Sequence, residues 1–201
     1  MKRNTTIRCI PWPACSRIMV SPHMVIITRY EERFNEEHAV FYIEVLEPTS
    51  IACPICSGVL TVRDSRRRRV IQPDGSRKLY QLRRLRCKSC RRIHTELPSC
   101  IQPRKHYGVA VIEGELDHRR GDCPAEESTR RRWRTAFSQA KGQIEGALKA
   151  SWTKDLQKGY PLLSPQPSLL DHLVSAGSGW LALVNSLLIS AGHGLHTRFA
   201  F

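Results

Sequence analysis

The sequence predicts an α+β fold, with strands in the first half of the chain and helices in the second. Short runs rich in β-branched residues end near residue 98, and apolar residues at three- and four-residue spacing begin at Tyr107. Both Cys-x-x-Cys pairs lie in the strand-rich half. These observations place a β-rich region before a helical one.

Length and composition describe an ordinary folded protein. The 201 residues are 41% apolar and 25% charged and show no Gly-x-y or heptad repeat, which excludes collagen, coiled coils and full disorder. No apolar run reaches the roughly 18 residues that cross a bilayer, so we expect no membrane association. Charged residues and prolines interrupt the start of the chain before a secretion signal forms, and we therefore expect a cytoplasmic protein with reduced cysteines.

The N-terminal part of the chain divides at Met24. Residues 1–23 carry prolines and arginines without a pattern, so we expect an unstructured leader there, with Met24 as an alternative native start. Met24–Ile27 and Phe41–Val45 are short strand-like runs that we expect to lie beside the cysteine pairs. The β-rich domain is expected to span residues 24–106.

Four cysteines form two Cys-x-x-Cys pairs that are thirty residues apart. A two-residue spacer lets one tight turn present both sulfurs to a tetrahedral metal, and two such turns complete a shell of four thiolates. Four thiolates favour Zn²⁺ in a zinc ribbon, although an iron–sulfur cluster can use the same ligands. A redox motif or a disulfide fits less well, since redox pairs occur singly and cytosolic thiols stay reduced. The predicted metal ligands are Cys53, Cys56, Cys87 and Cys90.

Other cysteines and one histidine lie near these pairs in the sequence. His94, Cys100 and Cys123 can compete as ligands, but four thiolates need no fifth ligand. We therefore expect His94 to pack or to contact phosphate. Cys9 and Cys15 have no evident partner.

The thirty residues between the pairs predict a hairpin. Two strand-like runs, Val59–Val62 and Val70–Ile71, precede a turn signal at Pro73–Gly75. Leu79–Leu82 then leads back toward the second pair. This spacer is longer than the roughly 15–20 residues of a compact ribbon, so we expect an elongated basic arm.

The net charge of +14 is concentrated around the cysteine pairs. Residues 63–105 hold fifteen Lys or Arg against only three acids. The positive charges of such a segment repel one another unless a polyanion lies near them. Most of these cations are arginine, which can grip phosphate or guanine bidentately. We therefore expect double-stranded DNA as the partner. The predicted contacts in this block are Arg66, Arg67, Arg68, Arg69, Arg83, Arg84, Arg86, Arg91 and Arg92.

Residues 107–150 are expected to form a helix-turn-helix. A first helix ends before Arg119, and Pro124 suits the start of a very short second helix. Ser128 or Thr129 can cap the third helix. The last helix of such a motif enters the major groove through its N-terminal residues.

The expected third helix is amphipathic and has a basic start. Trp133 and Phe137 begin its apolar face and are assigned to the structural core, whereas Gly142 and Gly146 weaken its later turns. Cations in a first turn face the positive end of the helix dipole, and a bound phosphate offsets that cost. The predicted DNA contacts here are Arg130, Arg131, Arg132 and Arg134.

The C-terminal part of the chain is apolar. Prolines and serines predict a linker over residues 151–168, and two apolar stretches with helical spacing follow on both sides of a Gly-Ser-Gly sequence. Residues 169–201 are therefore expected to form a helical hairpin or a kinked helix. Its apolar face must be buried against the preceding helices or a partner, and self-association through residues 169–191 is one such arrangement.

Three stretches of the chain carry a resemblance to known proteins. They are Cys53–Cys56, residues 83–98 with the second cysteine pair, and Ser128–Trp133. Over roughly residues 50–140 the chain resembles a bacterial zinc-ribbon family of unknown function and, more broadly, the zinc-ribbon and helix-turn-helix proteins of insertion elements. Such proteins form the N-terminal region of a transposase, or are small separate proteins that bind element ends and repress. The resemblance implies DNA binding near mobile elements, at the bacterial nucleoid.

The sequence thus predicts a zinc-dependent, non-enzymatic DNA-binding protein that is accessory or regulatory to a mobile element. Only Asp155 and Asp171 follow the helical motif, whereas a transposase core needs three dispersed carboxylates. No nucleotide-binding loop or hydrolase motif occurs, so we expect no small-molecule substrate. Two alternatives stay open: a zinc-ribbon interaction module that docks a transposase or another partner through its C-terminal helices, and an RNA-binding zinc ribbon.

Overall fold

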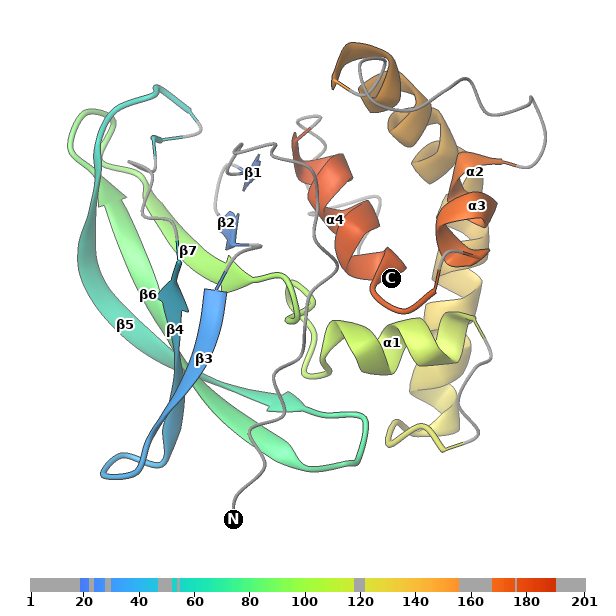
Figure 1. Ribbon diagram of the computed structural model, residues 1–201, viewed down its shortest axis with the longest axis horizontal. Helices are drawn as coiled ribbons and strands as arrows, with labels where there is room; N and C mark the ends of the chain where they lie inside the picture. Colours follow the sequence, from blue (N-terminus) through green and yellow to red (C-terminus); the bar gives the residue numbers. More distant parts are fainter. Residues whose placement is uncertain are drawn as a thin grey trace.

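The computed structural model describes residues 19–21, 24–27, 30–46, 52–53, 55–117, 122–155, 168–175 and 177–190. Across these ranges a seven-stranded sheet forms one side of the molecule and four helices form the other (Figure 1). The predicted α+β fold, with a β-rich N-terminal region followed by several helices, is confirmed. No helix in the described ranges is long and apolar enough to cross a membrane.

A long hairpin organises the sheet. Its two strands pair antiparallel from Leu60 opposite Cys87 to Ile71 opposite Arg77. The turn between them uses Gly75, whose φ of 78° favours glycine, and the Asp74 carboxylate accepts a hydrogen bond from a nearby amide. The hairpin expected between the cysteine pairs is therefore present. The strands are β1 (Met19–Ser21), β2 (Met24–Ile27), β3 (Tyr30–Asn35), β4 (Val40–Val45), β5 (Leu60–Ile71), β6 (Arg77–Cys87) and β7 (Ile93–Pro98).

Two strands share one edge of β6. Because β5 pairs along the other edge, β4 and β7 use different stretches of the same edge: β4 runs parallel at Tyr80–Gln81, and β7 runs antiparallel at Arg84–Arg86. β2 pairs with β7, and β3 pairs with β4. The strand expected at 41–45 therefore lies beside the hairpin, whereas β7 separates the strand at 24–27 from it. On its shared edge, β6 faces a gap between β4 and β7.

The core of the sheet is small. Glu32 lies at its margin and accepts hydrogen bonds from the Tyr80 hydroxyl (2.7 Å) and from Lys78 Nζ (2.8 Å). Burial, together with the negative charges that surround it, raises the pKa of Tyr80, so its hydroxyl remains a donor to Glu32. The buried apolar residues of this core are Ile43, Val70, Tyr80, Leu82, Leu97 and Ile101.

The helices bury a larger apolar core. α1 (Val109–Leu116) crosses the longer α2 (Glu127–Asp155), and α3 (Leu169–Ser175) and α4 (Trp180–Ser190) pack beside them (Figure 1). Leu170, Leu181 and Leu188 are fully buried in this core, together with Ile112 of α1 and Ile144 of α2. The apolar faces expected in the C-terminal part thus pack against the preceding helices.

Carboxylates from α1 and α2 hold the starts of α4 and α3. Glu113 accepts hydrogen bonds from the backbone N–H groups of Gly179 (2.7 Å) and Leu181 (3.0 Å). Glu145 accepts them from Leu169 (2.9 Å) and Leu170 (2.8 Å). Each carboxylate satisfies amides that a helix start leaves without an intrahelical partner.

Three strands, β1, β3 and β7, lie where no strand-like run was named from the sequence. β1 falls inside the expected unstructured leader, so that prediction is wrong for residues 19–21, whereas residues 1–18 and 22–23 lie outside the described part of the chain. β3 forms in a charged segment because Arg33 pairs with Glu44 of β4 at 2.7 Å and with Glu31 at 2.8 Å. Ion pairs between opposite charges on neighbouring strands stabilise a sheet, so a strand rich in charged residues can form here.

The helices differ from the expected pattern at two points. Residues 122–126 contain no helix, so the very short second helix is absent there, and α2 begins directly at Glu127 rather than after a cap at Ser128 or Thr129. α2 then continues through both glycines to Asp155, five residues into the expected linker. The rest of that linker up to residue 167 lies outside the described residues.

Candidate metal centre and basic surface

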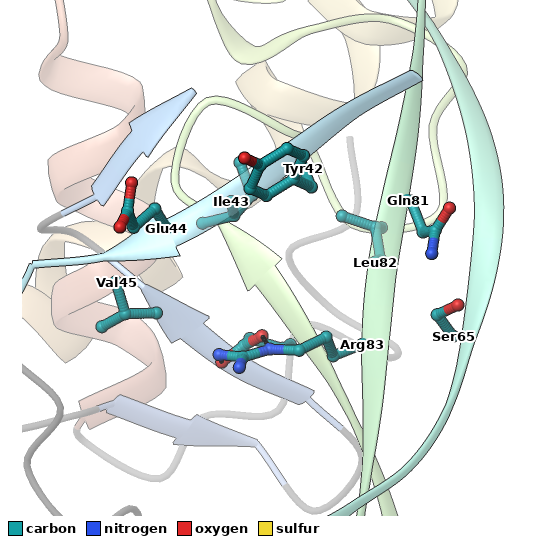
Figure 2. Close-up of a pocket in the computed structure, with 9 residues that line it drawn as sticks. Tyr42, Ile43, Glu44, Val45, Ser65, Gln81, Leu82 and Arg83 are labelled. Carbon is teal, nitrogen blue, oxygen red and sulfur yellow. Dashed lines mark hydrogen bonds and ion pairs between the residues drawn. The ribbon is translucent and has the colours of Figure 1, made fainter. Parts of the chain in front are cut away.

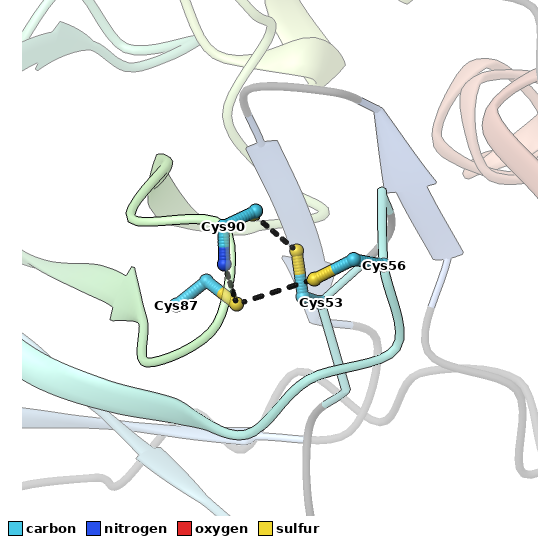
Figure 3. Close-up of side chains that lie close together, drawn as sticks. All are labelled: Cys53, Cys56, Cys87 and Cys90. Carbon is cyan, nitrogen blue, oxygen red and sulfur yellow. Dashed lines mark hydrogen bonds between the residues drawn. The ribbon is translucent and has the colours of Figure 1, made fainter.

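The four predicted metal ligands converge at one point. Cys53 Sγ lies 3.6 Å from Cys90 Sγ, Cys56 Sγ lies 3.5 Å from Cys87 Sγ, and all four sulfurs lie within 4.8 Å of one another (Figure 3). These separations exceed the roughly 2.05 Å of a disulfide bond. A tetrahedral zinc with bonds of about 2.3 Å sets its sulfurs roughly 3.8 Å apart. The cysteine cluster can therefore hold a metal ion of this size.

The two cysteine turns have the same backbone design. The amide of each first cysteine donates to the carbonyl five residues later: Cys53 to Gly58 (2.8 Å) and Cys87 to Arg92 (2.9 Å). The residue after each second cysteine adopts a left-handed conformation, with φ 57° at Ser57 and 63° at Arg91. Two equivalent turns thus present four sulfurs to one centre.

Gly58 permits the close approach of the two turns. A Cβ atom placed on Gly58 lies 2.5 Å from Ser89 Oγ and 3.0 Å from Cys87 Sγ, both on the opposite turn. Any larger residue therefore pushes the second cysteine pair away from the first.

The thiols ionise unequally. Burial opposes ionisation of Cys87, but hydrogen bonds from the Cys90 amide, the Cys56 thiol and the Ser89 amide outweigh it and lower the pKa of Cys87 to about 6. An amide hydrogen bond at Arg92 lowers the pKa of Cys90, but burial and the three neighbouring thiols raise it to about 12. A divalent cation bound between the sulfurs favours the thiolate form of all four cysteines, so that ionisation of one no longer hinders ionisation of the others. The four sulfur donors therefore fit such an ion.

His94 lies beside the cluster and is completely buried. Its Nε2 atom is 3.5 Å from Cys53 Sγ. Burial rules out the expected phosphate contact, whereas the expected packing role agrees with this position. A ring nitrogen at that distance orients the Cys53 thiolate rather than replacing it.

The remaining cysteines lie apart from the four-cysteine cluster. Cys100 Sγ lies 3.7 Å from a Glu32 carboxylate oxygen, and burial raises the pKa of this thiol to about 12. Cys123 is partly buried against the helical core. Cys9 and Cys15 lie outside the described residues.

Five of the thirteen predicted DNA contacts are used inside the protein. Arg68 donates to the carbonyls of Gln102 and Lys105 at 2.6 Å, and burial together with the charge of Arg66 lowers its pKa to about 10. Arg83 makes two hydrogen bonds to the buried Glu96 at 2.5 and 2.7 Å, and Arg84 pairs with Asp64. On α2, Arg130 and Arg134 both pair with the buried Glu115.

The other eight predicted contacts are exposed. Arg131 and Arg132 lie at the start of α2, where Arg132 also donates to the Thr129 hydroxyl at 3.0 Å. The remaining six lie on the hairpin and the second cysteine turn, and no ion pair engages them within the described ranges. We call these six the exposed arginine surface, which covers both faces of β5 because strand alternation places Arg66 on the other face from Arg67 and Arg69. The six are Arg66, Arg67, Arg69, Arg86, Arg91 and Arg92.

Trp133 and Phe137 lie on the inner side of α2. Trp133 is buried, with its ring edge-on to Tyr107 at a centroid distance of 5.0 Å. Phe137 packs against the same core and lies 5.6 Å from the Trp180 ring. These contacts join α2 to α4 and to the segment before α1.

The partners of the internally bonded arginines were missed by reasoning from the sequence. Glu96 and Asp64 counted only as scattered acids, but strand register places them beside Arg83 and Arg84. The available signal was strand alternation: Val70 is buried, so Arg68, two residues earlier, points to the same side. Sequence reasoning also missed a hollow between β4 and β6, lined in part by Tyr42 (Figure 2).

Part of the chain matches a known family model. The model is described as a domain of unknown function, DUF6431, and it matches residues 53–133. This segment holds both cysteine pairs, the β5–β6 hairpin, α1 and the start of α2. With the four-cysteine cluster, the match fits a zinc-ribbon-like family. No curated protein and no solved structure matches the chain.

Proposed function

We propose that this chain is a zinc-dependent, non-enzymatic DNA-binding protein in which the metal holds the base of the β5–β6 hairpin. The observation that carries the proposal is the exposed arginine surface. Six arginines face solvent on the hairpin and the second cysteine turn, whereas the nearby acids Asp64 and Glu96 are already paired with other arginines. A surface of this sign and density attracts a polyanion.

Zinc is the metal that suits the cluster best. All four donors are sulfur, and their mutual distances fit a single tetrahedral ion. An iron–sulfur cluster contains several irons and therefore spreads its cysteines farther apart. With four protein ligands the ion has no open position, so it supplies folding energy rather than chemistry.

The cellular setting belongs to the same proposal. From the resemblance of the cysteine and arginine motifs to insertion-element proteins, we infer an accessory or regulatory role at a mobile element, in the bacterial cytoplasm at the nucleoid. In this role the start of α2 adds Arg131 and Arg132 to the binding surface, the two predicted contacts on this helix that are exposed.

The alternative of an interaction module has less support. Its docking surface was to be the apolar face of the C-terminal helices, but Leu170, Leu181 and Val184 are buried in the protein's own helical core. Docking through an apolar face also responds little to salt, whereas binding through arginines responds steeply.

The test is a fluorescence-anisotropy titration of the zinc-loaded protein with random duplex DNA and with hairpin RNA, each at two salt concentrations. The proposal predicts tight duplex binding whose affinity falls steeply with salt, by about 0.9 in log–log slope for each phosphate contact. Absence of duplex binding at low salt overturns the proposal. Tighter binding to the RNA hairpin selects the RNA-binding alternative.

Two double variants locate the binding surface. Arg66→Gln with Arg86→Gln removes two exposed arginines and should reduce the salt slope by about 2. Lys141→Gln with Lys149→Gln removes the same charge from the far part of α2 and serves as the matched control. Equal losses in both variants show that only net charge matters, which contradicts a defined arginine surface.

A third variant separates the helix from the hairpin. Arg131→Gln with Arg132→Gln tests the contribution of α2, and a loss similar to that of the hairpin variant supports a shared DNA surface. An unchanged affinity removes α2 from the proposed interface and leaves the hairpin as the binding element.

A further inference from the structure

A hollow of about 510 Å³ opens in the sheet where β4 separates from β6 (Figure 2). It forms because β4 pairs with β6 only at Tyr80–Gln81, and β7 takes over the same edge from Arg84. The stretch of β6 between these two pairings therefore faces open space. Side chains from four strands line it, among them Tyr42, Glu44, Ser65, Gln81, Arg83 and Glu96.

Strand register places a transverse row of side chains beside this hollow. Tyr42 lies opposite Arg33 of β3 on one side and opposite Gln81 of β6 on the other. Gln81 in turn lies opposite Arg67 of β5. Directly opposed residues point to the same face of a sheet, so the row Arg33–Tyr42–Gln81–Arg67 crosses four strands on one face.

This row lies on the solvent side of the sheet. Neighbours along a strand point to opposite faces, and Phe41 and Tyr80, which adjoin Tyr42 and Gln81, belong to the core side. The Tyr42 side chain is 43% exposed. Arg69 follows Arg67 on the same face of β5, about 7 Å along the strand. The partly exposed Tyr42 thus borders a hollow on the same face as Arg67 and Arg69, neither of which has an ion pair in the described residues.

We propose that this hollow binds one unpaired nucleobase, stacked on Tyr42, with the phosphates of the same strand beside Arg67 and Arg69. The inference rests on the proposed nucleic-acid binding and adds to it a site for a base that is not paired. Bases inside a duplex are stacked on their neighbours and cannot offer a face to a side chain. The site therefore selects overhangs, bulges or single strands.

The polar groups of the hollow suit the edge of a base. The Gln81 amide offers both a donor and an acceptor, and the Ser65 hydroxyl offers either. Glu44 accepts a hydrogen bond from Arg33 at 2.7 Å through one oxygen, which offsets its charge and leaves its second oxygen for a base amino group. The Arg83–Glu96 pair forms a fixed wall, since two hydrogen bonds hold it.

The test compares two DNA duplexes that differ only in one unpaired nucleotide. One is blunt, and the other carries a single-nucleotide overhang of the fluorescent base 2-aminopurine. The full-length zinc-loaded protein should bind the overhang duplex about 5- to 100-fold more tightly and should quench its fluorescence, because a stacked base interacts strongly with an aromatic ring. A matching RNA duplex with the same overhang shows whether the site discriminates sugars.

Three variants assign the effect to the ring. Tyr42→Ala should abolish both the preference and the quenching, whereas Tyr42→Phe keeps the ring and should retain both. Phe34→Ala removes another exposed aromatic from the same strand pair, but on the opposite face, and should leave the preference unchanged. If Tyr42→Ala does not fold, photo-crosslinking with a 5-iodouracil overhang should label the peptide that contains Tyr42.

Each outcome separates this inference from the proposed function. Equal affinity for both duplexes, unchanged behaviour of Tyr42→Ala or a crosslink far from Tyr42 overturns the unpaired-base site while duplex binding stands. Binding of the overhang duplex with no binding of the blunt one overturns the duplex proposal and leaves the base site. Binding of neither overturns both.

Discussion

The β-rich region and the helical region bury very different amounts of apolar surface. Within the described residues, the helical core contains fifteen buried apolar side chains, whereas the core of the sheet contains six. The β-rich region instead holds the four-cysteine cluster at the base of a long hairpin. A small core cannot stabilise an extended hairpin alone, and we propose that a metal ion held by the cluster takes the place of apolar burial there.

This difference bears on function as well as on stability. The helical region pairs its internal acids Glu113, Glu115 and Glu145 with arginines and with helix starts. The hairpin instead exposes arginines along β5, whose outer edge pairs with no other strand in the described residues apart from a bridge between Ile71 and Tyr107. Charged side chains on such an edge also prevent pairing with other chains, so the same residues protect the strand and attract a polyanion.

Removal of the metal is expected to have the largest effect. Cys87→Ser with Cys90→Ser should abolish stoichiometric zinc and unfold the hairpin, since structural zinc contributes on the order of 10–16 kcal/mol in small domains. Hydrogen exchange should accelerate in β5 and β6 while α2 stays protected. Cys123→Ser, which removes a thiol outside the cluster, is the control. Retained zinc contradicts the four-cysteine centre.

Truncation of the helical core should have the next largest effect and should spare the metal. Ile144 is completely buried in that core, so Ile144→Ala is expected to lower the free energy of unfolding by about 2–5 kcal/mol in chemical denaturation. The exposed neighbour Gln143→Ala should change it little. Loss of zinc from the Ile144 variant shows that the two regions do not fold independently.

The carboxylate that caps α3 makes a smaller, pH-dependent contribution. Burial opposes ionisation of Glu145, but the amides of Leu170 and Leu169 and the ammonium of Lys149 lower its pKa below the ordinary 4.5. A lowered folded-state pKa means that the stabilisation is complete above about pH 4.5 and is lost as the pH falls through the folded value. Glu145→Ala should cost about 0.5–2 kcal/mol at neutral pH.

Glu145→Gln sharpens that prediction because it keeps an acceptor oxygen and removes the titration. Its unfolding free energy, measured by denaturant titration between pH 3 and pH 6, should show a weaker pH dependence than that of the unaltered protein. An identical pH dependence in both proteins assigns the effect to other carboxylates.

Two glycines in α2 offer the smallest effect, and it is stabilising. Gly142 and Gly146 are exposed, and a Cβ atom at either position meets nothing within 4 Å. Gly142→Ala and Gly146→Ala should each raise the free energy of unfolding by about 0.5–1 kcal/mol, visible as a higher melting temperature. A lower melting temperature indicates that the glycines serve contacts outside the described residues.

The cysteine cluster could be predicted from the sequence because its geometry is local. Two residues between thiols define a turn, and two such turns need only one hairpin to meet. Gly58 also indicated this arrangement, since it directly follows the first cysteine turn and leaves room for the second cysteine turn to approach. The order of strands before helices was equally readable from periodicity.

The roles of the arginines could not be predicted in the same way. Arg67 and Arg68 are neighbours in a uniform run, yet one faces solvent and the other binds two carbonyls under the hairpin. This outcome depends on strand register and on pairing with distant residues, as it does for Arg83 and Glu96. The hollow beside Tyr42 likewise arises where two strands share one edge, which no local pattern reveals.

The central claim is that metal, hairpin and arginines form one DNA-binding unit. The most direct test is the affinity of the full-length protein for random duplex DNA at one salt concentration, measured with zinc bound and after chelation, while circular dichroism monitors the helices. We expect chelation to weaken binding at least about tenfold with the helices still folded. Unchanged affinity of the zinc-free protein, with its helices folded, contradicts the account.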